Sequence, residues 1–146
     1  YPDCKWYIGI GSSCTGVASF STSYNDACMT IDIIKSFHHS NKCKAYEQLG
    51  LFGLLNINIE QFKRFTQQTI GPLIEYDQKT GSQLISTLNL YFENNCNLQK
   101  TARTGFIGLS TLKYRLKRIN QIAHIDLNKP ITNLMIHVAL KIFEGL

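Results

Sequence analysis

The chain has 146 residues, of which 44% are hydrophobic and 17% are charged, and its formal net charge is +5. This composition is that of a globular protein with one or two domains, and no run of apolar residues is long enough for a transmembrane helix. Residues 1–76 have equal numbers of basic and acidic side chains, so the positive excess lies in residues 77–146. Such a distribution indicates a partner that carries negative charge.

The residue types that usually carry catalysis or bind metals form no recognisable set. The five cysteines form no Cys-x-x-Cys pair, so a zinc site is not expected, and we expect reduced, mostly half-buried thiols. Four of the cysteines lie in the first 43 residues, which leaves a secreted disulfide framework as the alternative. Each of the four histidines is expected at the surface or with an ordinary partner. We predict no catalytic residue, no cofactor and no metal ion.

The first 56 residues predict a small, partial α/β segment. Apolar residues that alternate with others indicate a strand, and apolar residues at helical spacing then indicate a helix with a serine at its N-cap. A further short strand and a helical turn follow. The expected bounds are strand Trp6–Gly11, loop Ser12–Ser21, helix Ser23–Phe37, turn Asn41–Lys44, strand Ala45–Tyr46 and a helical start within Leu49–Leu55. We expect this segment to be the end of a domain whose earlier strands are missing from the chain.

One glycine-rich stretch in this segment resembles a dinucleotide-binding loop. Gly9 and Gly11 follow the strand and precede the helix, but the third glycine of Gly-x-Gly-x-x-Gly is replaced by Cys14. A simple bend from strand to loop is therefore the favoured interpretation.

Residues 57–146 predict a helical bundle. Asn58 is expected to cap a helix over Ile59–Thr69, which Gly71-Pro72 ends because proline disfavours helix in the preceding residue. The remaining expected elements are a helical turn Leu73–Tyr76, a loop Asp77–Gly81, a helix Gln83–Phe92 capped by Ser82, and a last helix that begins at Pro130. The last helix has an apolar face, which we expect to pack in the core; the alternative is that this face forms a dimer interface. It consists of Ile131, Leu134, Met135, Val138 and Ile142.

Residues 97–119 predict two short helices joined by a tight turn. Asn97 is suited to cap the first helix, and Gly105, in its last turn, and Gly108 flank the turn. The second helix, about Leu109–Ile119, has an apolar face of Leu112, Leu116 and Ile119. Its opposite face is polar and basic, as a helix that enters a DNA major groove requires. The sequence thus predicts a helix-turn-helix.

The candidate DNA contacts share basic or polar character, and no acidic residue occurs between Asn94 and Ile125. A surface of one sign favours phosphate binding, because neutralised phosphates release their counterions. Arg115 lies beside the apolar face and is either a contact or a structural brace, and Tyr114 either bonds a phosphate or covers the rim of the core. The candidates are Lys100, Arg103, Ser110, Thr111, Lys113, Tyr114, Arg115, Lys117 and Arg118.

Several blocks, GPLIEYD, LISTLNLYFENN, NLQKTA, TLKYRLKRI and IDL, resemble the C-terminal helix-turn-helix domain of PucR/CdaR-type bacterial regulators. YIGIG, SYNDA and AYEQLGLFGLL resemble the end of the degenerate GGDEF-like module that precedes it in that family. The resemblance implies residues 1–56 as the end of that module, residues 57–146 as the DNA-binding domain, and no enzymatic activity. It further implies a cytoplasmic transcription regulator that binds double-stranded DNA, forms a homodimer, and senses an effector through an N-terminal region.

The start of the second helix departs from that family. Gly108, Leu109 and Ser110 stand where the family has His, Arg and Asn. Since an arginine that pairs with a base contributes about 1–3 kcal/mol of discrimination, we expect weaker and more salt-dependent DNA binding than in relatives. Two alternatives remain: a dimerisation or protein-interaction module derived from a helix-turn-helix, and a ligand-binding fragment built on the α/β segment.

Overall fold

The computed structural model describes residues 4–37, 42–50, 52–53 and 59–144. The chain divides into two compact units, residues 1–62 with 142–146 and residues 63–141. Helices dominate the described part, and its strands form a two-stranded sheet. The predicted class, α+β with mostly α content, is confirmed.

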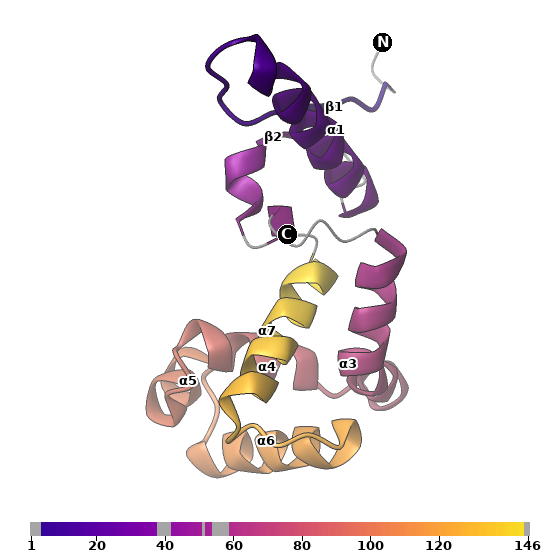
Figure 1. Cartoon of the computed structure of the whole chain (residues 1–146). Helices are drawn as coiled ribbons and strands as arrows, with labels where there is room; N and C mark the ends of the chain where they lie inside the picture. Colours follow the sequence, from indigo (N-terminus) through magenta and orange to yellow (C-terminus); the bar gives the residue numbers. More distant parts are fainter. Residues whose placement is uncertain (1–3, 38–41, 51, 54–58, 145–146) are drawn as a thin grey trace. The chain divides into compact units, whose positions relative to one another are not determined.

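The first unit is built around a β-α-β segment (Figure 1). Strand β1 (Tyr7–Ile10) and strand β2 (Lys42–Ala45) are parallel, with Tyr7 opposite Lys42 and Ile10 opposite Ala45. Helix α1 (Phe20–Phe37) connects them and packs on the sheet, after a 3-10 turn over Val17–Ser19. A second 3-10 turn, Tyr46–Leu49, follows β2. The predicted strand, helix and strand are therefore confirmed in order.

Two bounds in this unit differ from the prediction. Helix α1 begins at Phe20, so Ser23 lies inside the helix and is not its cap. The second strand covers Lys42–Ala45, where the sequence indicated a turn, because pairing with β1 holds these residues extended. Tyr46 instead opens a 3-10 turn, and its hydroxyl donates to the carbonyl of Gly53 at 3.1 Å.

Gly9 in β1 and Gly11, just after it, allow α1 to approach the strand closely. A Cβ at Gly9 would overlap the carbonyl oxygen of Ala27, and a Cβ at Gly11 would overlap that of Ser23. Since both oxygens belong to the backbone of the helix, no side-chain movement can relieve the overlap, and only glycine fits at these two positions. The packing of strand on helix explains this glycine pair.

The second unit contains the remaining helices. Helix α3 (Ile59–Thr80) enters it from Lys63 onward, and α4 (Leu84–Glu93), α5 (Leu98–Thr104), α6 (Leu109–Ala123) and α7 (Pro130–Glu144) follow. Helix α6 forms the lower edge of this unit in Figure 1. The hydrophobic core of the second unit contains residues from α3, α4, α6, α7 and the segment before α7. These residues are Ile70, Leu73, Leu84, Leu88, Phe92, Ile119, Leu127, Ile136, Ala139 and Leu140.

Helix α3 is the largest correction to the predicted elements. It runs without interruption through Gly71 and Pro72 to Thr80, where the sequence indicated an end, a helical turn and a loop. The clash that disfavours helix before proline involves the Cβ of the preceding residue, and Gly71 has none. Ile70 and Leu73 are fully buried on either side. Their packing holds the helix across the proline.

Helix α4 is capped by a residue of α3. The amides of Leu84 and Ile85 donate to the two carboxylate oxygens of Asp77, each at 2.9 Å. Ser82, the predicted cap, donates its own hydroxyl to the same carboxylate. Asp77 is therefore the residue that orients α4 on α3, and the prediction of a Ser82 cap is wrong.

The buried face of α7 also differs from the predicted stripe. Helix α7 begins at Pro130 as predicted, and its buried residues are Ile136, Ala139, Leu140 and Ile142, so the core prediction is confirmed for Ile142. Three residues of the predicted stripe are largely exposed: Ile131, Leu134 and Met135. The core interpretation is wrong for these three residues, because the helix is rotated to place Ile136 and Leu140 inside.

Cysteines and histidines have ordinary surroundings where the structure describes them. All five thiols are free; Cys28 and Cys96 are half-buried, and Cys4, Cys14 and Cys43 are exposed, contrary to the prediction that most are half-buried. His137 stacks on Phe92 with ring centroids 5.0 Å apart. His38, His39, Asn58 and part of the predicted helical start at Leu49–Leu55 lie outside the described residues.

Two further features concern the same described residues. None of their helices has the length and hydrophobicity needed to span a bilayer. Over that part of the chain, no three His, Cys, Asp or Glu side chains lie close enough together to hold a metal ion.

Candidate nucleic-acid interface

Helix α5 is set by its cap and by two small buried residues. The Asn97 side chain accepts a hydrogen bond from the amide of Lys100 at 2.9 Å, as predicted. Thr101 and Ala102 are buried, so α6 can pack closely against this face. The side chains of Lys100 and Arg103 are exposed.

The turn between α5 and α6 is tight and locally strained. Gly105 follows the last helical residue, Thr104, and so lies just outside α5 rather than in its last turn. Phe106 adopts a φ of 52°, the left-handed region that non-glycine residues seldom occupy. Its ring is 96% exposed. The amide of Ile107 donates to the carbonyl of Ala102 at 3.0 Å and closes the turn.

Helix α6 has the two faces that its sequence predicts, although it continues four residues past Ile119, to Ala123. Leu112 and Ile119 are fully buried and Leu116 packs against the core. On the opposite side, a group of polar and basic side chains is exposed. These are Ser110, Thr111, Lys113, Tyr114 and Lys117. Tyr114 is 67% exposed, so it does not cover the rim of the core.

The two arginines of α6 are held by the rest of the unit. Arg115 Nη1 donates to Thr87 Oγ1 on α4 at 2.9 Å, which makes Arg115 a brace between these helices. Arg118 Nε donates to the hydroxyl of Tyr76 on α3 at 3.4 Å, and its guanidinium lies 5.2 Å from the centre of that ring. This bond to Tyr76 raises the pKa of Arg118 above its ordinary value.

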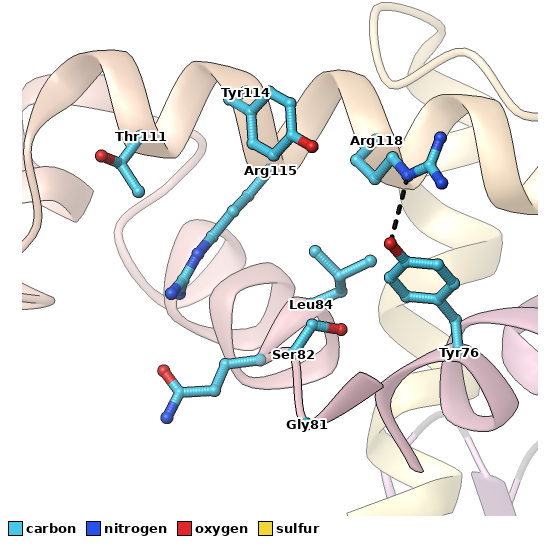
Figure 2. A pocket seen from close by; sticks show the side chains of 9 residues that line it. Tyr76, Gly81, Ser82, Leu84, Thr111, Tyr114, Arg115 and Arg118 are labelled. Atoms are coloured by element: carbon cyan, nitrogen blue, oxygen red, sulfur yellow. Dashed lines mark hydrogen bonds between the residues drawn. The ribbon is translucent and has the colours of Figure 1, made fainter. Parts of the chain in front are cut away.

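A pocket of about 430 Å³ opens beside these arginines (Figure 2). We call it the Arg118 pocket. Figure 2 shows Arg115 extending from α6 towards the start of α4, while the Tyr76 ring rises from α3 towards Arg118. The pocket is lined by Tyr76, Gly81, Ser82, Gln83, Leu84, Thr111, Tyr114, Arg115 and Arg118. Sequence reasoning selected the four α6 residues but missed the wall from α3 and α4.

The electrostatics of this surface are one-sided. Within the described residues, the basic side chains of α5 and α6 form no salt bridge, and the pocket lining includes no acidic residue. The nearby Asp77 carboxylate is occupied by Ser82 and the two α4 amides. The arrangement therefore presents uncompensated positive charge and hydroxyl groups on one side of α6, as phosphate binding requires.

The candidate residues do not all lie in one place. Seven of them lie on α6: Ser110, Thr111, Lys113, Tyr114, Arg115, Lys117 and Arg118. Thr111, Tyr114, Arg115 and Arg118 also line the Arg118 pocket, whereas Lys113 and Lys117 do not. Lys100 and Arg103 lie on α5.

Helices α4, α5 and α6 pack against one another, with α5 and α6 joined by a tight turn and α6 exposing a basic face. This arrangement defines a helix-turn-helix DNA-binding domain. Comparison with known families is more specific: residues 84–142 match the PucR C-terminal helix-turn-helix domain. These residues are similar to domains of that type.

Characterised relatives of the whole chain are transcription regulators by name. The chain is 29% identical over 145 residues to the proline-responsive transcriptional activator PutR of Bacillus subtilis (strain 168), covering 94% of this chain and 34% of PutR. It is 28% identical over 138 residues to the DNA-binding transcriptional activator AdeR of the same organism, covering 92% and 33%. The carbohydrate diacid regulator of Escherichia coli (strain K12) is 28% identical over 145 residues, covering 99% and 37%. The chain thus spans about a third of the length of these relatives.

Proposed function

We propose that this chain is the DNA-binding part of a transcription regulator and that α6 enters the major groove. The observation that carries the proposal is the exposed, acid-free face of α6 within a PucR-type helix-turn-helix domain. A recognition helix places its first residues at base edges and its flanks near phosphates. The resemblance to activators and regulators of transcription supports the same function.

The roles of individual residues follow from their positions on the helix-turn-helix. Ser110 and Thr111, in the first turn of α6, are the candidates for contact with base edges. The exposed cations Lys113 and Lys117 are candidates for backbone phosphates on one flank. Lys100 and Arg103 on α5 are candidates for phosphates farther along the duplex. Tyr114, whose hydroxyl lies outside the core, is a candidate for a hydrogen bond to a phosphate.

The decisive experiment measures binding of the chain to a random-sequence duplex at two salt concentrations by fluorescence anisotropy. We expect the affinity to fall steeply with salt, and the Lys113→Ala/Lys117→Ala variant to show a slope of log K against log[salt] that is smaller by about two. The matched control, Lys35→Ala/Arg64→Ala, removes two exposed charges outside the helix-turn-helix and should retain the wild-type slope. Absence of binding even at low salt would favour the protein-interaction alternative.

The first unit belongs, in this proposal, to a larger α/β module of the GGDEF-like kind, without enzymatic activity. Ile8 and Ile10 of β1 are about half exposed, at 50% and 52%. Parallel sheets are normally covered on both faces, so additional structure is expected against these residues in the whole protein. Slower amide hydrogen exchange in β1 of the whole protein than in this chain would support the assignment, and equal exchange would contradict it.

The regulator is further proposed to act as a homodimer in the cytoplasm, where its DNA lies. The exposed α7 residues Ile131, Leu134 and Met135 are the candidate seam. In a symmetric dimer, two recognition helices about 34 Å apart would meet successive turns of the groove.

An effector would act through a region outside this chain; PutR, a relative, is described as proline-responsive.

A further inference from the structure

The Arg118 pocket has the donors needed for an anion, and these donors belong to side chains. A guanidinium carries five N–H groups. Within the part of the chain that the structure describes, the hydrogen bonds of Arg118 are long, at 3.4 Å to the Tyr76 hydroxyl and 3.4 Å to Gln121 Oε1. The first amides of α4 and the Ser82 hydroxyl are already taken by Asp77. An anion in this pocket is therefore recognised by the arginines and not by the end of the helix.

The position of the pocket on α6 indicates the source of that anion. Thr111, Tyr114, Arg115 and Arg118 are spaced i, i+3, i+4 and i+7, so they form one flank of α6. Lys113 and Lys117 are spaced i, i+4 on the other side of the exposed face. A helix in the major groove has one DNA strand along each flank. A strand that passes the Thr111 flank therefore meets the pocket.

We infer that the Arg118 pocket seats one phosphodiester group of the DNA strand that runs along the Thr111 flank of α6. Arg118 is the contact, and Tyr76 is the residue that positions it, through its ring and its hydroxyl. Arg115 adds positive charge while it braces α4. This inference rests on the proposed function, and it adds α3 and the start of α4 to the DNA-binding surface.

The test uses the whole 146-residue chain and a duplex that this chain selects from a random pool. Each phosphate of that duplex is replaced in turn by a neutral methylphosphonate, and the Kd is measured by fluorescence anisotropy. We expect neutralisation at one phosphate per binding site to cost the wild type about tenfold in affinity. Arg118→Gln should lose about tenfold on the unmodified duplex and nothing more on that modified duplex.

Three further variants make the assignment specific. Lys117→Gln should remain sensitive to the same methylphosphonate, because its own phosphate lies on the other strand. Tyr76→Phe retains the ring but loses the hydroxyl; it should lower the affinity in the wild-type background and have no effect in Arg118→Gln. Arg64→Gln, a matched loss of an arginine, should bind as the wild type, because it lies roughly 18 Å from Tyr76 along α3. Thermal melting confirms that each variant is folded.

The outcomes separate this inference from the proposed function. If the wild type selects a duplex but Arg118→Gln binds it unchanged, the pocket inference is overturned and the function stands. The same conclusion follows if a nucleoside monophosphate shifts the Arg118 side-chain NMR signals while Arg118→Gln leaves the DNA affinity unchanged, because the pocket then serves a free anion. If the wild type selects no duplex at any salt concentration, the proposed function itself fails.

Discussion

In the proposed DNA complex, Leu109 is the residue that we expect to limit base recognition by α6 most. It occupies the first position of the helix and is 38% exposed. A leucine offers only apolar contact, such as that with a thymine methyl group, whereas an arginine side chain is able to pair with guanine. On the proposed function, α6 therefore keeps the fold of a recognition helix but lacks an arginine that would contact DNA from its first turn.

We predict that Leu109→Arg increases affinity for duplex DNA by about tenfold and leaves the slope of log K against log[salt] nearly unchanged, because an arginine paired with a base neutralises no phosphate. The side chain is partly exposed, so the substitution should leave the fold intact. Anisotropy titrations at two salt concentrations measure both quantities, with Leu109→Gln as the uncharged control. An unchanged affinity in Leu109→Arg would mean that this end of α6 does not face the duplex.

Phe106 is strained without being buried. Its positive φ costs an L-residue about 1–2 kcal/mol, and its exposed ring gains little from packing. We predict that Phe106→Gly raises the free energy of unfolding by about 1 kcal/mol, since the relief of strain exceeds the added entropy of the unfolded chain. Urea denaturation measures this change. Phe106→Ala keeps the strain and should show no gain; equal losses in both variants would reveal an unrecognised contact of the ring.

At the scale of elements, Asp77 joins α3 to α4 through two amide hydrogen bonds. We predict that Asp77→Ala destabilises the chain by about 2 kcal/mol, because it leaves the first amides of α4 unsatisfied. Asp77→Asn retains one acceptor oxygen and should lose about half as much. Thermal melting followed by circular dichroism gives the comparison. If Asp77→Ala leaves the thermal stability unchanged, water replaces the cap without loss of stability.

Helix α3 shows how an element can override its own local signals. Glycine followed by proline normally ends a helix, yet α3 continues for eight residues beyond Pro72 and thereby delivers Tyr76 to Arg118 and Asp77 to α4. A helix that ended at Gly71 would leave the Arg118 pocket without its α3 wall. The continuity of this helix is thus a condition for the site.

At the scale of the whole molecule, the proposed dimer depends on the exposed face of α7. We predict that Leu134→Glu, which places a charge in the proposed seam, converts the dimer to a monomer in analytical ultracentrifugation without loss of helical content. DNA affinity should fall with it, because two linked sites bind more tightly than one. Gln68→Glu, which adds one negative charge at an exposed position of α3, is the matched control. A monomeric wild type would contradict the proposed dimer.

The sequence by itself determined the helix-turn-helix and the residues exposed on it. Asn97 caps α5, and Leu112, Leu116 and Ile119 face inward, because these features depend on interactions within four residues along the chain. The order of strand, helix and strand in the first unit was readable for the same reason. The contacts of the candidate residues with DNA remain predictions.

Only the tertiary structure decided which local signals prevail. Packing of Ile70 and Leu73 in the core stabilises α3 as a continuous helix across Pro72. The Asp77 carboxylate, seven residues before α4, caps that helix in place of the predicted Ser82. The Arg118 pocket joins residues 42 positions apart. The orientation of α7 exposes Ile131, Leu134 and Met135, which their spacing placed in the core. Each of these outcomes depends on side chains from different helices meeting in space, and the periodicity of a single helix contains no information about its partners.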